Sequence, residues 1–326
     1  MRYYCTYFDR HYLLRGLALY RSLKAHAEPF TLWVLCFDDQ SYETLAKLAQ
    51  TDLRPVALAD FERGDIELLA AKPTRSKVEY YFTCSPSLPL YLIKNNPEID
   101  IVTYLDADLY FYESPEPIFE ELGTDSILIV GHRFPENLRF IEVNGIYNVG
   151  LVSFCNDERG RNCLEWWRER CLEWCYDRQE DGKYADQKYL DDWPVRFSGV
   201  HVLQNLGAGL APWNWAGASL QIQHNKILVN GEPLIFFHFS NLKILSSWLY
   251  DSVSDGRLYG EMPLPLRRAL YRPYLEALKH TASWLKEQGL PENYFVYQDL
   301  RTRSYGWRKF VSKLRRGKLM FHWGLK

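Results

Sequence analysis

Residues 101–108 read Ile-Val-Thr-Tyr-Leu-Asp-Ala-Asp, an apolar run typical of a buried strand followed by two carboxylates two positions apart. Acids in this place lie at the carboxyl end of the strand, and a turn there lets both reach one cation. Hard dications take oxygen ligands from one or two carboxylates and complete their shell with phosphate oxygens. A bare Asp-X-Asp is common by chance, so Asp106 and Asp108 also fit two solvated loop acids.

The hundred residues before this stretch alternate between strand-like and helix-like segments. The expected strands span 2–8, 31–37, 53–58 and 101–105, and the expected helices span 13–24, 41–49 and 77–94. Ser41 is the expected N-cap of the second helix. The alternation predicts an α/β fold, with a mostly parallel sheet flanked by helices. Ligands of such sheets bind beyond the carboxyl ends of the strands. Five acids follow expected strand ends: Asp9, Asp38, Asp39, Asp106 and Asp108.

The second half of the chain is less regular. Its expected strands span 127–131, 147–154, 195–203, 220–223, 226–229 and 234–239, and its expected helices span 160–176 and 184–190. Pro194 is expected to follow the end of the second of these helices. From about residue 246 the pattern is helical and increasingly basic. We therefore expect one α/β unit over 1–245 and a helical, basic C-terminal region over 246–326.

Composition narrows the class of protein. With 47% hydrophobic residues, the 326-residue chain has enough apolar side chains for a sizeable core, and its net charge of −2 argues against a nucleic-acid binder. Seven cysteines without dense spacing predict buried thiols in a reducing compartment. Neither a signal peptide nor an apolar run of about 20 residues is evident. These observations favour a cytoplasmic protein.

Several short segments recur in the order typical of one enzyme family. They are Phe8-Asp9-Arg10-His11-Tyr12, Tyr104-Leu105-Asp106-Ala107-Asp108, Tyr147-Asn148-Val149-Gly150, Asp186-Gln187 and His238-Phe239. Over residues 1–245 the chain resembles GT-A-fold glycosyltransferases, nearest to glycosyltransferase family 8 and related bacterial nucleotide-diphospho-sugar transferases. The resemblance implies a GT-A-like, Rossmann-like catalytic domain. It also implies sugar transfer from a nucleotide-diphosphate donor, UDP-sugars being favoured, to a hydroxyl acceptor with retention of configuration.

The resemblance also assigns roles to individual residues. Asp106, Asp108 and His238 would bind Mn²⁺ or Mg²⁺, and Asp186 and Gln187 would lie beside the anomeric carbon as catalytic residues. The implied donor contacts are Thr6, Tyr7, Asp9, Tyr12, Lys77, Asp106, Ala107, Asn148, Gly150 and Trp213.

The residue types suit these roles. The Asn148 amide can hydrogen-bond sugar hydroxyls, and Gly150 permits close approach of a ligand. Imidazole is a good Mn²⁺ ligand, and His238 follows four apolar residues of an expected strand. Trp213 belongs to a glycine- and tryptophan-containing loop, 207–215, that fits either a sugar site or simple packing.

The chain departs from the family pattern at two places. Asn241 stands where the family has Gly three residues after the His, and Lys243 comes one position early. Tyr81 is followed by Phe82 rather than the usual Arg, so that Arg75 or Lys77 would have to supply the missing charge. The donor sugar therefore cannot be transferred from the family.

Residues 301–326 form a basic tail that contains Trp and Phe side chains and no acid. This composition is typical of an interfacial membrane segment, and anionic headgroups attract it by about 1 kcal/mol per charge. Such docking would place the enzyme on the inner face of a membrane and fit a lipid-linked acceptor in cell-surface polysaccharide or lipopolysaccharide synthesis. A nucleic-acid-binding tail and a merely solvated tail are the alternatives.

Three other functions share parts of the pattern. A haloacid-dehalogenase-like phosphatase would carry its Asp-X-Asp near the N-terminus, with Thr or Val where Tyr110 stands here. A nucleotidyltransferase would have a basic, glycine-rich loop after the first strand, unlike residues 6–9. A catalytically idle sugar-binding or membrane-scaffold protein would not need the intact acid pair and His238.

Overall fold

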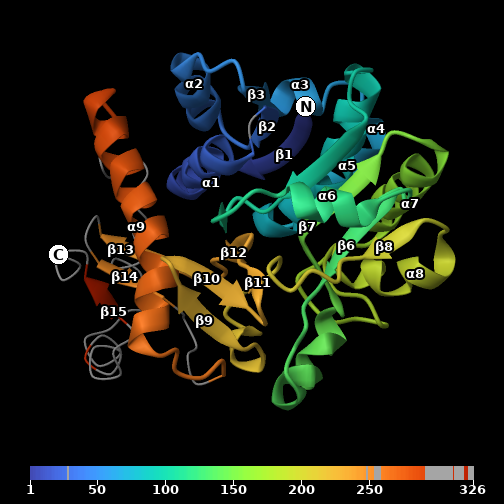
Figure 1. Cartoon of the computed structure of the whole chain (residues 1–326). Helices are drawn as coiled ribbons and strands as arrows, with labels where there is room; N and C mark the ends of the chain where they lie inside the picture. Colours follow the sequence, from blue (N-terminus) through green and yellow to red (C-terminus); the bar gives the residue numbers. More distant parts are fainter. Residues whose placement is uncertain (28, 247–248, 253–257, 291–310, 312–318, 322–326) are drawn as a thin grey trace.

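A computed structural model describes the chain except for residues 28, 247–248, 253–257, 291–310, 312–318 and 322–326 (Figure 1). Its main sheet has seven strands in the order β3-β2-β1-β4-β7-β6-β8. Their bounds are β1 (Arg2–Phe8), β2 (Phe30–Cys36), β3 (Leu53–Ala57), β4 (Ile101–Leu105), β6 (Ile127–Gly131), β7 (Tyr147–Cys155) and β8 (Val200–Val202). All neighbouring pairs are parallel except those of β7, which runs antiparallel to β4 and β6. The predicted mostly parallel sheet is confirmed.

The reversed strand β7 matters for the site. Leu105, the last residue of β4, pairs with Leu151, so the start of β7 lies at the same edge as the end of β4. That edge therefore collects the carboxyl ends of β1, β2, β4 and β6 together with the first residues of β7.

Helices cover both faces of this sheet. The α-helices are α1 (Leu13–His26), α2 (Asp39–Leu48), α3 (Leu58–Phe61), α4 (Ile66–Ala71), α5 (Lys77–Asn95), α6 (Glu116–Leu122), α7 (Glu158–Glu173), α8 (Trp193–Arg196) and α9 (Leu264–Glu287). The 3₁₀ helices are η1 (Arg10–Tyr12), η2 (Lys72–Thr74), η3 (Glu136–Asn144), η4 (Lys188–Asp192) and η5 (Trp215–Gly217). Alternate residues of each strand point to opposite faces. Tyr4 and Phe8 of β1 accordingly join one apolar core with α1 and α9, whereas Cys5 joins the other with α5 and α7.

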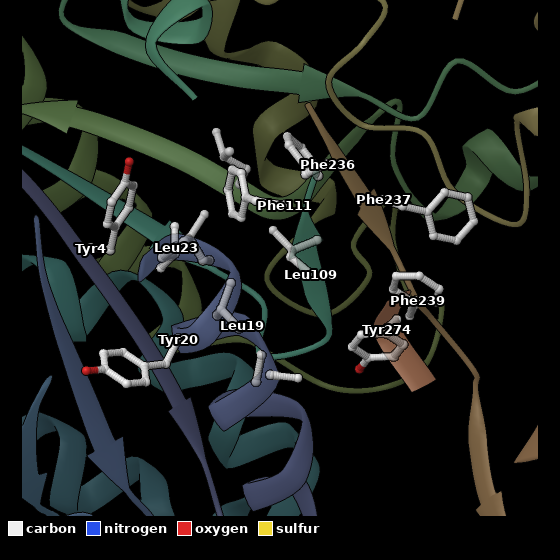
Figure 2. Packing of buried hydrophobic residues seen from close by; sticks show 14 of the residues in the cluster. Tyr4, Leu19, Tyr20, Leu23, Leu109, Phe111, Phe236, Phe237, Phe239 and Tyr274 are labelled. Carbon is white, nitrogen blue, oxygen red and sulfur yellow. The ribbon is translucent and has the colours of Figure 1, made fainter. Parts of the chain in front are cut away.

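A two-stranded ribbon extends the first core beyond the sheet. It pairs β5 (Leu109–Phe111) with β12 (Phe236–His238) in antiparallel register. Figure 2 shows Phe111 and Phe236 side by side, with ring centroids 5.5 Å apart. Phe239 stacks on Tyr274 of α9 at 3.9 Å, so α9 closes this core from the far side. These contacts hold the end of β12 next to the end of β4.

The C-terminal region differs from its prediction. A helix is present, α9, but β13 (Lys243–Ser246), β14 (Leu249–Asp251) and β15 (Leu319–Phe321) form a small sheet where helix was expected. A third sheet contains β9 (Leu220–Gln223), β10 (Lys226–Val229) and β11 (Glu232–Pro233). The predicted membrane-binding tail, residues 301–326, lies outside the described residues except at 311 and 319–321. Among the described residues, no helix is long and apolar enough to span a bilayer.

Three local predictions were wrong. Asp38, rather than Ser41, caps α2, because its carboxylate accepts the backbone N–H of Ser41 at 2.7 Å. The helix expected over 184–190 is replaced by η4 and then α8, which carries Pro194 in its first turn, where its missing N–H costs nothing. The strand expected over 195–203 shortens to β8 because α8 takes its first residues.

Candidate active site

Two acids and one histidine meet at the end of β4. Nε2 of His238 lies 3.0 Å from Oδ1 of Asp108 and 3.6 Å from Oδ2 of Asp106. One ligand atom of each residue lies within 4.8 Å of the others. Two carboxylates and one imidazole form a donor set that fits Mn²⁺ or Mg²⁺. The cluster is thus a candidate cation site, made of the three residues that the sequence predicted for it.

The backbone fixes these side chains in place. Because β12 pairs with β5, His238 ends a strand whose continuation bonds back to the acid loop, with the N–H of Phe239 donating to the carbonyl of Asp108 at 2.9 Å. The Tyr104 hydroxyl donates to Oδ1 of Asp106 at 2.8 Å. The second oxygen of Asp106 faces His238, and the side chain keeps about a third of its surface exposed (32%). The acid pair is therefore held from behind and open on one side.

Burial and the neighbouring charges shift the pKa values of Asp106 and Asp108 in opposite directions. Burial raises the pKa of Asp106, the neighbouring His238 lowers it and Asp108 raises it further. Burial also acts to raise the pKa of Asp108, but the closer His238 outweighs it and holds that pKa below its usual value. The pKa of His238 is raised, because the two carboxylates outweigh its burial. Such a site favours bound positive charge.

Gly150 lets the first residues of β7 approach the cation site. Its carbonyl accepts the backbone N–H of Asp106 at 2.9 Å. A Cβ at this position would lie 2.4 Å from Oδ1 of Asn148 and 3.0 Å from Nδ1 of His238, closer than real contacts allow. Oδ1 of Asn148 instead accepts the N–H of Gly150 at 2.8 Å. The Asn148 amide oxygen is therefore bonded to the backbone of Gly150, and its contact with a sugar hydroxyl stays a prediction.

Asp186 is buried close to the cation site. Burial raises its pKa to about 7, a hydrogen bond with Ser85 acts to lower it, and the charge of Asp106 raises it. Its backbone carbonyl accepts the indole N–H of Trp167 at 2.8 Å. Asp186 is thus a protonatable acid fixed from the α7 side.

Gln187 lies beside Asn148, with 3.5 Å between its Oε1 and Nδ2 of Asn148. Its Nε2 donates to the carbonyl of Asn144 at 3.0 Å. The following Gly145 has φ +135°, and a Cβ there would lie 3.0 Å from Cγ of Gln187. The helix expected over 184–190 does not form at these two residues: Gln187 is the N-cap residue of the five-residue 3₁₀ helix η4.

A second cluster forms at the end of β1. Asp9 caps η1 by accepting the N–H of His11 at 2.9 Å, and its Oδ2 accepts from Lys77 Nζ at 2.7 Å and from the Tyr81 hydroxyl at 3.2 Å. Tyr81 stacks on Phe37 with ring centroids 3.8 Å apart. Burial acts to raise the pKa of Asp9, but the bond from Lys77 holds it below its usual value.

The two clusters meet through aromatic residues. The Tyr7 ring lies 5.4 Å from that of Tyr104 and 6.0 Å from that of Tyr81. The other predicted donor contacts lie at the margins of this group. Thr6 and Ala107 are buried, and Tyr12 is 40% exposed with the Arg15 guanidinium 4.4 Å above its ring.

The charge missing after Tyr81 is not replaced by Arg75. Its guanidinium donates to the carbonyl of Leu172 at 3.0 Å, near the end of α7, and lies over the Tyr176 ring. Lys77, the second candidate, pairs with Asp9 at the end of β1.

Trp213 is packed rather than exposed. Its indole N–H donates to the carbonyl of His132 at 3.0 Å, and its ring lies edge-on to that of His238 at 5.2 Å. Asn214 donates to the same carbonyl of His132 at 2.9 Å. The loop 207–215 therefore packs against His238 of the candidate cation site.

Sequence reasoning missed four residues that shape the site: Tyr81, Ser85, Tyr104 and His132. His132 had a signal, because it directly follows the expected strand 127–131 and so falls on the same sheet edge as the acids. Tyr104 belongs to the quoted motif, but its hydrogen bond to Asp106 could not be predicted, because the sequence does not show that its side chain turns toward the sheet edge.

Comparison with known proteins supplies relatives. The chain is 36% identical over 304 residues to uncharacterized protein YfnF of Bacillus subtilis (strain 168), covering 91% of this chain and 98% of YfnF. It is 29% identical over 288 residues to uncharacterized protein YfnD of the same organism, covering 87% and 90%. No protein-family model matches the chain.

Solved structures supply the fold. The structure of galactosyltransferase LgtC in complex with donor and acceptor sugar analogs superposes with a TM-score of 0.52 at 16% identity, covering 82% of this chain and all of LgtC (100%). An active-site mutant of LgtC gives a TM-score of 0.51 over the same shares. The predicted GT-A fold is thereby confirmed. The chain has the GT-A fold and, by its identity and coverage, belongs to the family of Bacillus subtilis YfnF.

Proposed function

We propose that this protein is a metal-dependent glycosyltransferase that moves a sugar from a nucleotide-diphosphate donor to a hydroxyl acceptor. The observation that carries the proposal is the cluster of Asp106, Asp108 and His238 at the sheet edge, with Asp186 and Gln187 beside it. In a GT-A fold this edge is the ligand-binding edge. Residues 1–245 form the proposed catalytic unit.

The three ligands of the cation site would hold Mn²⁺ or Mg²⁺. When bound, such an ion neutralises negative charge that develops on a leaving diphosphate. Tyr104 keeps Asp106 turned toward His238 by its 2.8 Å hydrogen bond. Gly150 lets the imidazole lie against β7. These contacts give the protein a preorganised ligand set rather than one assembled by the donor.

The second cluster would receive the nucleotide. Asp9 is the N-cap of η1 and Tyr12 is its last residue, and Lys77 places an exposed ammonium beside Asp9. Thr6, Tyr7 and Ala107 would complete this side as the buried lining between the two clusters. A UDP-sugar remains the favoured donor because of the resemblance of residues 8–12 to the family's nucleotide-binding turn.

Asp186 and Gln187 would face the transferred sugar, with Gly150 and Trp213 around it. Asp186 is a buried acid whose pKa of about 7 lets it exchange its proton near neutral pH. Retention would proceed by attack on the same face from which the diphosphate leaves, with Gln187 stabilising the oxocarbenium-like state.

The acceptor is a saccharide or a lipid-linked hydroxyl compound. LgtC, whose structure holds donor and acceptor sugar analogs, offers a precedent for both partners on this fold. A cytoplasmic location, with residues 301–326 attracting the protein to an anionic inner membrane face, would suit a lipid-linked acceptor. Deletion of 301–326 should abolish binding to anionic vesicles, and unchanged binding would contradict the membrane proposal.

The proposal is tested by thermal unfolding with Mn²⁺ and a panel of UDP-, GDP- and CMP-sugars, for wild type and Asp108→Ala. A ligand at a hundred times its dissociation constant adds about 2.7 kcal/mol. We expect a metal-dependent shift for one nucleotide class that the substitution removes. The absence of any shift in the wild type would favour an idle sugar-binding or scaffold protein, and a shift that persists in the variant would contradict the role of Asp108 in the site.

A further inference from the structure

His132 lies behind the sugar side of the proposed site. It directly follows β6, is 5% exposed and stacks on Phe134 with ring centroids 4.7 Å apart. Its carbonyl is the acceptor shared by Trp213 and Asn214. Its Nε2 lies 3.2 Å from Nδ2 of Asn148. The residue thus joins the tryptophan loop to the start of β7.

The chemistry of this contact fixes the tautomer of His132. Because Oδ1 of Asn148 accepts the N–H of Gly150, its NH₂ group faces His132. An NH₂ group cannot accept, so we assign Nε2 of His132 as the acceptor and the ring proton to Nδ1, which has no hydrogen-bond partner among the described residues. Burial agrees with a neutral ring, because it lowers the pKa of His132 to about 4, and the nearby His238 lowers it further. At neutral pH the imidazole is therefore a hydrogen-bond acceptor toward Asn148.

The accepting imidazole reinforces the orientation that the Gly150 N–H gives to the Asn148 amide. Oδ1 of Asn148 accepts the N–H of Gly150, and Nδ2 faces His132. A flipped amide would point its carbonyl at a lone pair and its NH₂ group at a backbone donor. Both ends of Asn148 therefore specify the same orientation.

The oriented Asn148 amide in turn faces Gln187. Its Nδ2 also lies 3.5 Å from Oε1 of Gln187, a long contact that still favours a carbonyl there. The opposite end of Gln187 donates to the carbonyl of Asn144 at 3.0 Å. Gly145 leaves room for this arrangement, because any side chain there would meet Gln187.

We propose that His132 is a positioning residue that acts through Asn148 to fix which end of the Gln187 amide faces the sugar side. This inference rests on the proposed function, in which Gln187 stabilises the transferring sugar. Among the described residues, no hydrogen bond or ion pair joins the His132 side chain to Asp106, Asp108 or His238. We therefore expect its main effect on the reaction to pass through the two amides.

The test compares three variants. His132→Phe keeps a flat ring for Phe134 and Trp213 but removes the acceptor. His132→Gln restores an acceptor oxygen. His201→Phe, on β8 away from the site, controls for the loss of a histidine. We expect His132→Phe to retain Mn²⁺ affinity and donor KM, to lose roughly 10- to 100-fold in kcat and to be partly rescued by His132→Gln. His201→Phe should keep the wild-type kcat.

A double-mutant cycle with Gln187→Ala separates positioning from general damage. If His132 acts through Gln187, the His132→Phe substitution should change kcat less than about twofold in the Gln187→Ala background. Equal losses in both backgrounds, or an unchanged kcat in His132→Phe, would overturn the inference.

A second measurement needs no turnover. In ¹H–¹⁵N spectra the side-chain NH₂ signal of Gln187, assigned by its disappearance in Gln187→Ala, should move in His132→Phe and return in His132→Gln. An unmoved signal would overturn the inference even if the wild type transfers no sugar. Failure of the proposed function alone would instead appear as absent turnover with the amide signals behaving as expected.

Discussion

Two strands of the same sheet end in acids, and their surroundings differ in kind. At the end of β1, Asp9 accepts from Lys77, Tyr81 and the backbone of His11. At the end of β4, Asp106 and Asp108 share the single imidazole of His238. Position in the fold is therefore the same, whereas the balance of charge is not.

The difference shows that the protein can supply all the donors around a strand-end carboxylate or can leave the carboxylate able to bind a ligand. The carboxylate of Asp9 meets an ammonium and two further donors, and its pKa is lowered. Two neighbouring carboxylates at β4 repel each other, and the pKa of Asp106 is raised by burial and by Asp108. Proximity to a second acid, rather than burial alone, marks the cation site.

The largest expected effect is the loss of Mn²⁺ affinity when one acid of the pair Asp106 and Asp108 is replaced. Asp108→Asn removes the carboxylate nearest to His238, so Mn²⁺ affinity, measured by titration of the free-ion EPR signal, should fall about 100-fold or more. Asp39→Asn is the matched control, because Asp39 also follows a strand but lies exposed on α2. Equal affinity in Asp108→Asn and wild type would remove the distinction drawn between the two strand ends.

The second effect tests the closeness of β7 to the acid pair. Gly150→Ala inserts a methyl group 2.4 Å from Oδ1 of Asn148 and 3.0 Å from Nδ1 of His238. We expect a loss of about 1–3 kcal/mol in the free energy of unfolding and a weaker Mn²⁺ site. Urea unfolding measures the first and EPR titration the second.

Gly217→Ala serves as its control. The new Cβ would lie 3.4 Å from that of Pro135, an ordinary contact. Its stability should stay within about 0.5 kcal/mol of the wild type. If Gly150→Ala behaved the same way, β7 would have to yield more readily than its hydrogen bond to Asp106 suggests.

Features that depend on a local sequence pattern could be predicted from the sequence. The strands 2–8, 101–105 and 127–131 were predicted with their observed bounds, because each is rich in aromatic or β-branched residues and ends before a polar residue. The acids after them were found for that reason. His238 was placed correctly by resemblance and by the apolar run before it.

Other features depend on contacts that no local pattern reveals. Asp38 caps α2 in place of Ser41. Its carboxylate is held there because it also accepts the backbone N–H of Arg10, which is distant in the sequence but adjacent in space. Burial of Trp213 depends on the carbonyl of His132, 81 residues earlier. The strand β14 pairs with β13 on one side and with β15, from the distant tail, on the other.

The third effect concerns Asp186, a buried acid with no ion pair to any described residue. Its pKa rises from 3.8 to about 7, so the folded protein keeps a proton that the unfolded chain releases. The wild type therefore loses stability as pH rises from about 4 through 7. Asp186→Asn removes this loss, and its stability relative to wild type should increase by about 2–3 kcal/mol between pH 5 and pH 8.

Urea unfolding at both pH values in EDTA measures the difference for Asp186→Asn and wild type. Taking the difference between the two proteins cancels the titration of distant groups. A gap that stays constant from pH 5 to pH 8, or that narrows, would show that Asp186 is already charged in the folded protein.

The smallest expected effect on stability comes from the ion pair between Asp9 and Lys77. The Lys77 side chain is 62% exposed, so its ion pair with Asp9 should contribute less than about 1 kcal/mol, and Lys77→Met should unfold almost as the wild type does. The chain offers a close match in Lys24, which pairs with Asp52 at 3.1 Å beside a Tyr20 hydroxyl bonded to the same acid. Lys24→Met should cost similar stability.

If Asp9 and Lys77 receive the nucleotide, Lys77→Met alone should raise the donor KM several-fold and leave Mn²⁺ affinity unchanged. A fall in Mn²⁺ affinity comparable to that of Asp108→Asn would mean that the two strand ends form one electrostatic unit, because Lys77 forms no ion pair with Asp106 or Asp108 in the described part of the chain.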